Sequence, residues 1–189
     1  TPSIGGVGLI SNYKKMVTMD LKKIDNLVLV IGKTEGHIDQ SLFARNILDE
    51  KNGPPPEVNL FNEKNNGETL LRLIDDGLIK SAHDISLGGI ITAISKMCIK
   101  GKKGIKLKKP KYLINDVEYF FAEDQGRYLI EITKEDYKKV TEILNKNAVH
   151  FDELGIISED MLYINDKTKV TIDELKTSHT SWLKQYMDK

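Results

Sequence analysis

The stretch that most constrains this fold is a polar, glycine-rich turn that leads directly into an apolar segment. The turn reads Ala82-His83-Asp84-Ile85-Ser86-Leu87-Gly88-Gly89, and residues 90–98 continue it. Adjacent glycines let the backbone pass close to a neighbour or a ligand, and the free amides at a helix start form an anion site. The pattern predicts a strand end, a tight surface turn and a buried helix that Asp84 and Ser86 cap.

Composition restricts the classes of protein that fit. The chain has 189 residues, of which 40% are hydrophobic and 30% charged, and its net charge is +0. One domain is expected at roughly 100–200 residues per domain, and a balanced charge argues against nucleic acid or an anionic membrane as a partner.

No apolar run approaches the ~20 residues that cross a bilayer. A single cysteine excludes an internal disulfide framework, so a cytoplasmic protein is expected. Thr1 opens a glycine-rich phrase without a methionine, so we expect a piece of a longer protein.

Short strands alternate with helices along the chain. Strands are predicted at 16–20, 27–31, 105–107, 128–132, 151–158 and 161–164, with 27–31 as a buried central strand. Helices are predicted at 41–50, with Leu42, Ile47 and Leu48 facing the core, and at 70–74, after a turn at 65–67 and ending near Gly77. A further helix is predicted at 116–121, and another begins behind an N-cap at Thr133 and places Tyr137, Val140 and Leu144 towards the core. The last predicted helix, at 178–187, follows a turn at 171–175.

These elements predict an α+β or α/β sandwich, in which helices flank a mixed β-sheet. Residues 1–15 are expected to be a linker or docking segment, and residues 16–189 a single domain.

Two polar segments are candidate sites, and each has a structural alternative. Asp84 and Ser86 could hold a phosphate or a magnesium-bound phosphate, but their spacing alone favours a helix cap. The loop from Glu123 to Arg127 precedes an apolar strand, and Gln125 could read an amide or a base edge. A Glu/Arg network that steadies a turn explains that loop equally well.

The remaining chemistry-bearing residues favour structural roles. His83 is disfavoured as a general base, because neighbours on a strand face opposite sides. The four histidines and Cys98 are scattered, which argues against zinc, and Cys98 is expected to be inert in the core. The glycines at 5–8 and 32–36 lack the phosphate-loop patterns and are expected to form ordinary turns.

Five phrases then resemble one family when they are taken in order. They are Pro2-Ser3-Ile4-Gly5-Gly6-Val7-Gly8-Leu9, Gly36-His37-Ile38-Asp39-Gln40-Ser41-Leu42, Ala82 to Gly89, Glu123 to Tyr128 and His179-Thr180-Ser181-Trp182-Leu183. Together they resemble the C-terminal part of phosphoribosylformylglycinamidine synthase II, over essentially the whole chain. The wider superfamily looks like aminoimidazole ribonucleotide synthetase, selenophosphate synthetase and thiamine-monophosphate kinase.

The resemblance implies an AIR synthase C-terminal-domain-like fold and a reaction of the whole enzyme. ATP with magnesium activates the amide oxygen of formylglycinamide ribonucleotide, and ammonia from glutamine then displaces phosphate to give the amidine. Such phosphoryl transfer needs positioning and charge neutralisation more than a protein nucleophile. The implied partners are the enzyme's own N-terminal domains, a glutaminase subunit and a small accessory subunit. Neither nucleic acid nor a membrane is implied.

The resemblance also assigns cleft residues, although no catalytic residue and no metal ligand are expected here. The candidate ligand-binding residues are Asp84, Ser86, Gly88, Gly89, Glu123, Asp124, Gln125 and Arg127. The family turn usually reads Asp-x-Ser-Asp-Gly-Gly, whereas Leu87 stands at the second aspartate here. We therefore expect this chain alone to be catalytically silent and to bind neither ATP nor magnesium. The alternatives are a nucleotide- or phosphate-binding regulatory module and a complete small kinase, against which the missing ATP-domain sequence argues.

Overall fold

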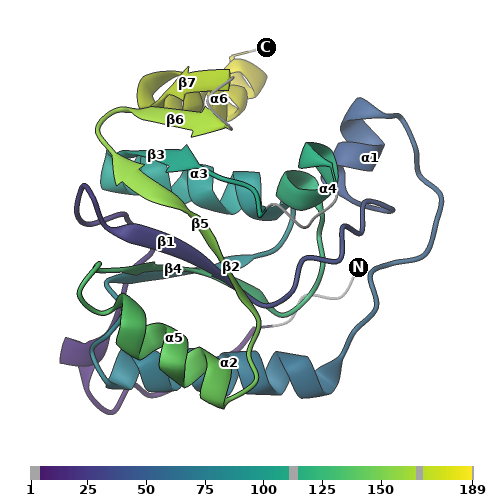
Figure 1. The fold of residues 1–189 in the computed structure, drawn as a ribbon. Helices are drawn as coiled ribbons and strands as arrows, with labels where there is room; N and C mark the ends of the chain where they lie inside the picture. Colours follow the sequence, from purple (N-terminus) through teal and green to yellow (C-terminus); the bar gives the residue numbers. More distant parts are fainter. Residues whose placement is uncertain (1–4, 111–114, 165–167, 189) are drawn as a thin grey trace.

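The computed structural model describes residues 5–110, 115–164 and 168–188, and its described strands form one seven-stranded mixed sheet (Figure 1). The strand order is β2-β4-β1-β5-β3-β6-β7. The strands are β1 (Leu27–Ile31), β2 (Ser81–Ile85), β3 (Gly104–Leu107), β4 (Arg127–Ile132), β5 (Phe151–Ser158), β6 (Met161–Ile164) and β7 (Thr168–Thr171). All neighbouring pairs are antiparallel except β3 and β6, so the expected mixed sheet is confirmed.

Helices cover both faces of the sheet. They are the 3-10 helix η1 (Tyr13–Lys15) and the α-helices α1 (Leu42–Ile47), α2 (Leu60–Asp75), α3 (Gly89–Gly101), α4 (Asp116–Phe121), α5 (Tyr137–Lys146) and α6 (Ile172–Met187). In Figure 1, α2 and α5 lie on one side of β1 and β4, while α3 and α4 lie on the other. Within the described residues, no helix is long and apolar enough to cross a membrane.

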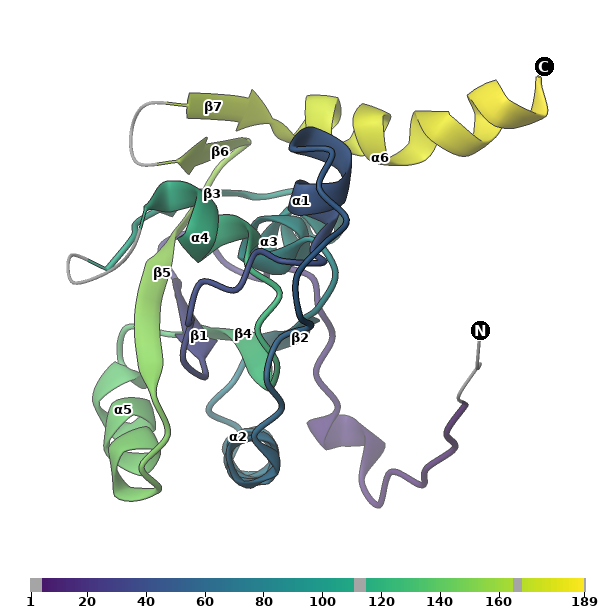
Figure 2. The ribbon, with the colours of Figure 1, turned by 90° about the vertical axis from the view of Figure 1, so that its right-hand side faces the viewer.

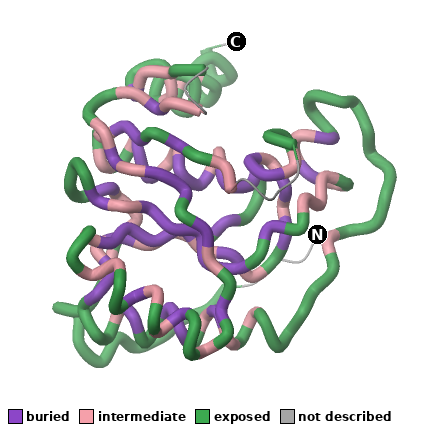
Figure 3. The backbone as a smooth tube through the Cα atoms, in the orientation of Figure 1, coloured by how far each residue is buried: buried purple, intermediate pink, exposed green. Residues whose placement is uncertain are grey.

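The central strand β1 shows why the sheet is buried on both faces. It pairs with β4 on one side and with β5 on the other. Its side chains alternate, so Val28 and Val30 join the core under α3, whereas Leu29 and Ile31 join the core under α2 and α5. Figure 3 shows the buried backbone concentrated in these inner strands and in α3. A continuous apolar run is what such a strand requires, and the prediction at 27–31 is confirmed.

Several predicted elements have the observed bounds, and others are wrong. Strands 151–158 and 161–164 and helix 116–121 are confirmed, and Gly77 follows the end of α2 with a positive φ. The predicted turn at 65–67 is wrong, because α2 runs through it. The predicted strand at 16–20 is only an isolated bridge between Thr18 and Ser81. The break between 171–175 and 178–187 is also wrong, because α6 is continuous behind a Thr171–Glu174 capping box.

Predictions of helix start and helix face were partly right. The Asp136 amide donates to Thr133 Oγ1 (3.1 Å), as a cap at Thr133 requires, but regular α5 begins only at Tyr137. Val140 and Leu144 are fully buried, as expected from their spacing. The predicted core face of 41–50 is wrong for Ile47 and Leu48, which are exposed; Leu42 is half-buried, and Ala44 is the buried residue of α1. Helix α1 is too short for helical periodicity to identify its inner face.

Cys98 lies on the inner face of α3, in the core, and is fully buried. Burial raises the pKa of its thiol to about 12, and the thiol rather than the thiolate then dominates at neutral pH. We expect Cys98 not to react with DTNB at pH 8 in the folded protein and to react fully in 6 M guanidinium. Rapid reaction of the native protein, with unchanged circular dichroism, would show that the thiol is accessible.

Glu131 is a buried carboxylate that fastens the segment before β1 to the sheet. It accepts hydrogen bonds from the amides of Lys22 (2.7 Å) and Lys23 (3.1 Å), from Asn26 Nδ2 (2.7 Å) and from Ser81 Oγ (3.0 Å). Hydrogen bonds to a charged acceptor are worth about 1.5–3 kcal/mol each.

Replacing Glu131 with glutamine turns one acceptor oxygen into a donor that faces other donors. We expect Glu131→Gln to lower the free energy of unfolding by about 2–3 kcal/mol, measured by urea denaturation. The matched control is Glu142→Gln on the exposed side of α5, for which a change within about 0.5 kcal/mol is expected. Equal effects of the two substitutions would mean that Glu131 does not anchor this segment.

Candidate functional site

The predicted site residues lie at one end of the strands, where β1 and β2 end and β4 begins. Strands β1 and β2 are both antiparallel to β4, so the ends of β1 and β2 lie beside the start of β4. Three connections therefore come together there: residues 32–37 after β1, residues 86–89 after β2, and residues 122–126 before β4. Figure 2 shows these ends of β1, β2 and β4 together between α2 and the α3–α4 layer.

Arg127 is the central cation at this end of the strands and is only 1% exposed. Its Nε donates to the carbonyl of Asp124 (3.1 Å), one Nη to Thr34 Oγ1 (2.9 Å) and the other to the carbonyl of Ala122 (2.7 Å). Burial lowers the pKa of the guanidinium, and the Asp124 carboxylate, 3.8 Å away, opposes that shift. The guanidinium thus holds the loop before β4 and joins it, through Thr34, to the connection after β1.

The carboxylates of Glu123 and Asp124 also bond inside the protein. Glu123 Oε1 accepts the amides of Leu42 (2.7 Å), at the start of α1, and of Gly88 (2.8 Å), at the start of α3. Asp124 accepts the amides of Glu35 (3.1 Å), Gly36 (3.2 Å) and His37 (3.2 Å). These amides are the donors that a bound anion would use. Of the two interpretations of this loop, the geometry therefore supports the structural one, in which a network of polar side chains steadies a turn.

The turn after β2 departs from the predicted cap. Helix α3 has Gly88 as its N-cap and no side-chain hydrogen bond there, so the capping role expected for Asp84 and Ser86 is wrong. Glu123 supplies the acceptor instead, from a distant part of the chain. Gly89 has a φ of +68°, and a Cβ there would lie 2.6 Å from the Ala122 carbonyl oxygen. The adjacent glycines thus allow the backbone of the turn after β2 to lie close to the backbone of residues 120–122.

Leu87 is 59% exposed on this turn. It therefore does not pack in the core, and replacing it with aspartate should not open a cavity. We expect Leu87→Asp to change the free energy of unfolding by less than about 0.5 kcal/mol, as measured by urea denaturation. A loss above about 2 kcal/mol would show that Leu87 is buried in solution.

A polar hollow of about 490 Å³ opens beside the network. Of the predicted site residues, Asp124 and Gln125 line it, and the first turns of α2 supply Asn59, Asn62, Glu63 and Asn66. Asn66 Nδ2 donates to the Gly126 carbonyl (2.9 Å) and so joins α2 to the loop. The sequence pattern did not indicate these α2 residues, because residues 65–67 read as a turn and not as part of a helix.

Asp84 lies on the exposed edge strand, outside this hollow. Its Oδ1 is 2.9 Å from Nδ1 of His83, a contact that strand alternation did not suggest. Burial, together with the nearby charges of Glu63 and Asp84, raises the pKa of Tyr128. Ser86 is exposed on the turn. The structure thus brings Glu123, Asp124 and Arg127 together with the turn glycines and leaves Asp84 and Ser86 at the rim.

The donor set at this end of the strands does not fit a magnesium ion. Within 5–110, 115–164 and 168–188, no group of three or more His, Cys, Asp or Glu side chains is placed to hold a metal. The best-placed carboxylates, those of Glu123 and Asp124, already accept backbone amides. A hard cation prefers several free oxygens, and these two carboxylates already accept five backbone amides.

Comparison with known proteins gives a consistent result. The family model for "AIR synthase related protein, C-terminal domain" matches residues 23–165. The phosphoribosylformylglycinamidine synthase subunit PurL of Pelagibacter ubique is 71% identical over 100% of this chain and 26% of that protein. The same subunit of Bartonella henselae is 38% identical over 99% of this chain and 25% of its own length. The chain thus spans about a quarter of the curated relatives it matches.

The fold comparison agrees with the family match. The structure of Thermotoga maritima PurL complexed with FGAR aligns with a TM-score of 0.71 and 20% identity, over 86% of this chain and 30% of that one. That level of identity shows the fold alone, and the fold is the mixed sheet with flanking helices described above. With the family model matched over residues 23–165, the chain belongs to the family of AIR synthase related proteins, as their C-terminal domain.

Proposed function

We propose that this chain is the C-terminal domain of a phosphoribosylformylglycinamidine synthase. The observation that carries the proposal is the 71% identity to the P. ubique PurL subunit along the whole chain. The whole enzyme would use ATP to activate the amide oxygen of formylglycinamide ribonucleotide, and ammonia would then displace phosphate. Residues 1–15 would link the domain at 16–189 to the rest of the enzyme; residues 1–4 lie outside the described residues.

In this proposal the domain forms one wall of a ligand cleft and supplies no catalytic residue. Glu123, Asp124 and Arg127 hold the loop before β4 against α1, α3 and residues 34–37. Gly88 and Gly89 shape the neighbouring turn. Asp84, Ser86 and Gln125, which are exposed, are the residues that would face a ligand. A wall of this kind contributes by positioning and by excluding water.

The cofactors and partners are proposed for the whole enzyme. The T. maritima PurL structures include complexes with ATP and with FGAR, and another is titled a structure of PurLQS. We infer that the enzyme containing this chain binds ATP and magnesium on its other domains and assembles with a glutaminase subunit and a small accessory subunit. A cytoplasmic location would suit such an assembly.

The test compares the chain alone with a chimera. In the chimera, this chain replaces the matching 26% of the P. ubique subunit. Amidine formation is measured with ATP, ammonium chloride and formylglycinamide ribonucleotide. We expect turnover by the chimera and none by the isolated chain. Turnover by the isolated chain would refute the silent domain, and an inactive but folded chimera would refute the assignment.

The alternative, a regulatory module that binds a nucleotide or phosphate at residues 84–89, makes a different prediction. Calorimetric titration of ADP into the isolated chain would then show saturable binding that is lost in a variant of that turn. The Gly88 amide already donates to Glu123, so we expect no such binding there.

A further inference from the structure

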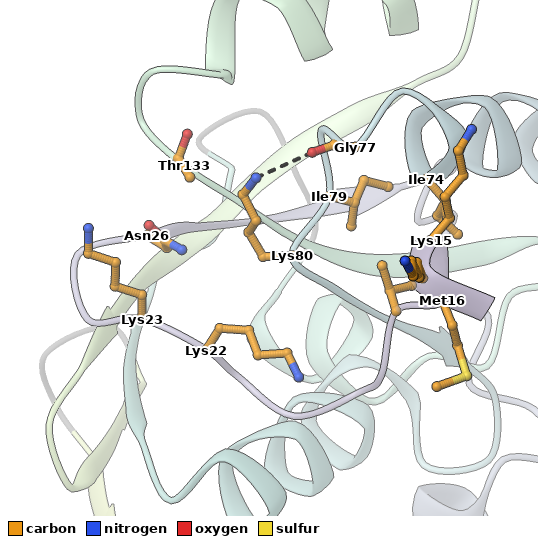
Figure 4. Close-up of a pocket in the computed structure, with 12 residues that line it drawn as sticks. Lys15, Met16, Lys22, Lys23, Asn26, Ile74, Gly77, Ile79, Lys80 and Thr133 are labelled. Carbon is orange, nitrogen blue, oxygen red and sulfur yellow. Dashed lines mark hydrogen bonds between the residues drawn. The ribbon is translucent and has the colours of Figure 1, made fainter. Parts of the chain in front are cut away.

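A second pocket, of about 510 Å³ (Figure 4), lies at the opposite ends of the strands from the candidate site. It is built where β1 and β2 begin and β4 ends, from η1, the segment before β1, the α2–β2 connection and Thr133. The candidate site lies at the other ends of the same three strands. The two places therefore cannot share a compact ligand.

The pocket concentrates positive charge in a chain whose net charge is +0. Five lysines line it, and none of its lining residues is acidic: Lys14, Lys15, Lys22, Lys23 and Lys80. Three of them have carboxylate partners outside the lining, namely Asp75 for Lys15 (3.5 Å), Asp20 for Lys22 (2.7 Å) and Asp136 for Lys80 (3.6 Å).

Two of the five lysines have ammonium groups available for a ligand. Within the part of the chain that the structure describes, the side chains of Lys14 and Lys23 make neither a hydrogen bond nor a direct ion pair, and the charge of Lys23 acts on Glu135 only weakly, helping to lower the pKa of that exposed carboxyl. Both residues are exposed on the rim. A ligand can therefore pair with them without breaking an existing contact, which lowers the cost of binding an anion.

The interior of the pocket is apolar. Met16 and Val17 contribute from the N-terminal segment, and Ile74 and Ile79 from the two ends of the α2–β2 connection. Small-molecule sites are concave spaces of roughly 300–1,000 Å³ with an apolar lining and a few polar groups. An apolar floor under a cationic rim fits a ligand with an apolar body and anionic groups.

The arrangement of the lysines indicates more than one anionic group. In Figure 4, the ammonium nitrogens of Lys22, Lys23 and Lys80 lie at separate places around the pocket and do not meet at one point. A ligand with a single charge could engage only part of this rim. We propose that this pocket binds an organic polyphosphate, whose apolar or aromatic body lies on the isoleucines and whose phosphates pair with the lysines, since lysine binds phosphate as a point charge.

The test uses ATP as the probe and nuclear magnetic resonance of the ¹⁵N-labelled chain as the readout. We expect saturable amide shifts at residues 14–17, 22–26, 77–80 and 133, and none at 86–89 or 124–126. Inorganic triphosphate should bind at the same residues but more weakly than ATP, because it lacks the apolar body. Binding should weaken as salt rises from 50 to 300 mM, since exposed charges are screened.

A charge-matched pair of variants completes the test. Lys14→Ala/Lys23→Ala should weaken ATP binding at least about fivefold, whereas Lys138→Ala/Lys139→Ala, which removes the same charge from the exposed face of α5, should leave it unchanged. Equal weakening by both variants would overturn the proposal, as would shifts confined to 86–89 and 124–126, or no saturable shifts. None of these outcomes depends on the chimera assay, so this inference and the proposed function can fail independently.

Discussion

Replacement of Arg127 by methionine is expected to remove about 3–5 kcal/mol from the free energy of unfolding. The substitution keeps an unbranched side chain but removes the donors to Thr34, Ala122 and Asp124. It also leaves the Asp124 carboxylate, 7% exposed, without its nearby cation. Small domains have total stabilities of about 5–15 kcal/mol, so the variant should be close to unfolding in mild denaturant.

Urea denaturation followed by circular dichroism measures this effect. The control is Arg72→Met, because Arg72 pairs with Asp76 (3.9 Å) on the exposed surface of α2; its loss should stay below about 1 kcal/mol. If Arg127→Met cost no more than Arg72→Met, the buried network would not be what fixes the loop before β4.

The second large effect is expected for Gly89→Ala. A Cβ at Gly89 would lie 2.6 Å from the Ala122 carbonyl oxygen and 2.8 Å from that of Phe120, both of them backbone atoms. The left-handed conformation, with φ +68°, costs about 1–2 kcal/mol for a residue with a side chain, and the overlap adds about 1–3 kcal/mol. We expect a total loss of about 2–5 kcal/mol in the same denaturation experiment.

Gly77 offers a matched control for this prediction. It has a similar φ of +71°, but a Cβ there would meet nothing within 4 Å. Gly77→Ala should therefore show the conformational cost alone, about 1–2 kcal/mol. Identical losses at the two positions would mean that the approach of the turn to residues 120–122 is looser than the structure indicates.

Much of the framework could be predicted from local patterns. The run at 27–31 is apolar at every position, and only a strand covered on both faces buries all of it. Val140 and Leu144 were placed in the core by helical spacing alone. The helix through 65–67 could not be predicted, because Asn66 is held by a hydrogen bond to Gly126, which lies 60 residues away. Tertiary contacts here override weak local propensity.

The candidate site shows the same division between local and distant information. The sequence indicated that residues 84–89 and 123–127 carry the polar groups, and the strand directions bring them together. The sequence was compatible with two roles for these polar groups, ligand binding and an internal network. The choice depends on contacts between distant residues, such as Glu123 Oε1 with the amides of Leu42 and Gly88. Which of the exposed residues Asp84, Ser86 and Gln125 touches a ligand stays a prediction.

We infer that the carboxylates of Glu123 and Asp124 stabilise the domain and take no part in the chemistry. The direct test is Glu123→Gln in the chimera described above, with kcat and urea stability measured on the same preparation. Glutamine keeps an acceptor oxygen but removes the charge that two helix starts share. We expect a kcat within about threefold of the parent chimera, together with a loss of stability of about 1–2 kcal/mol. A kcat reduced about hundredfold or more, with stability unchanged, would contradict it.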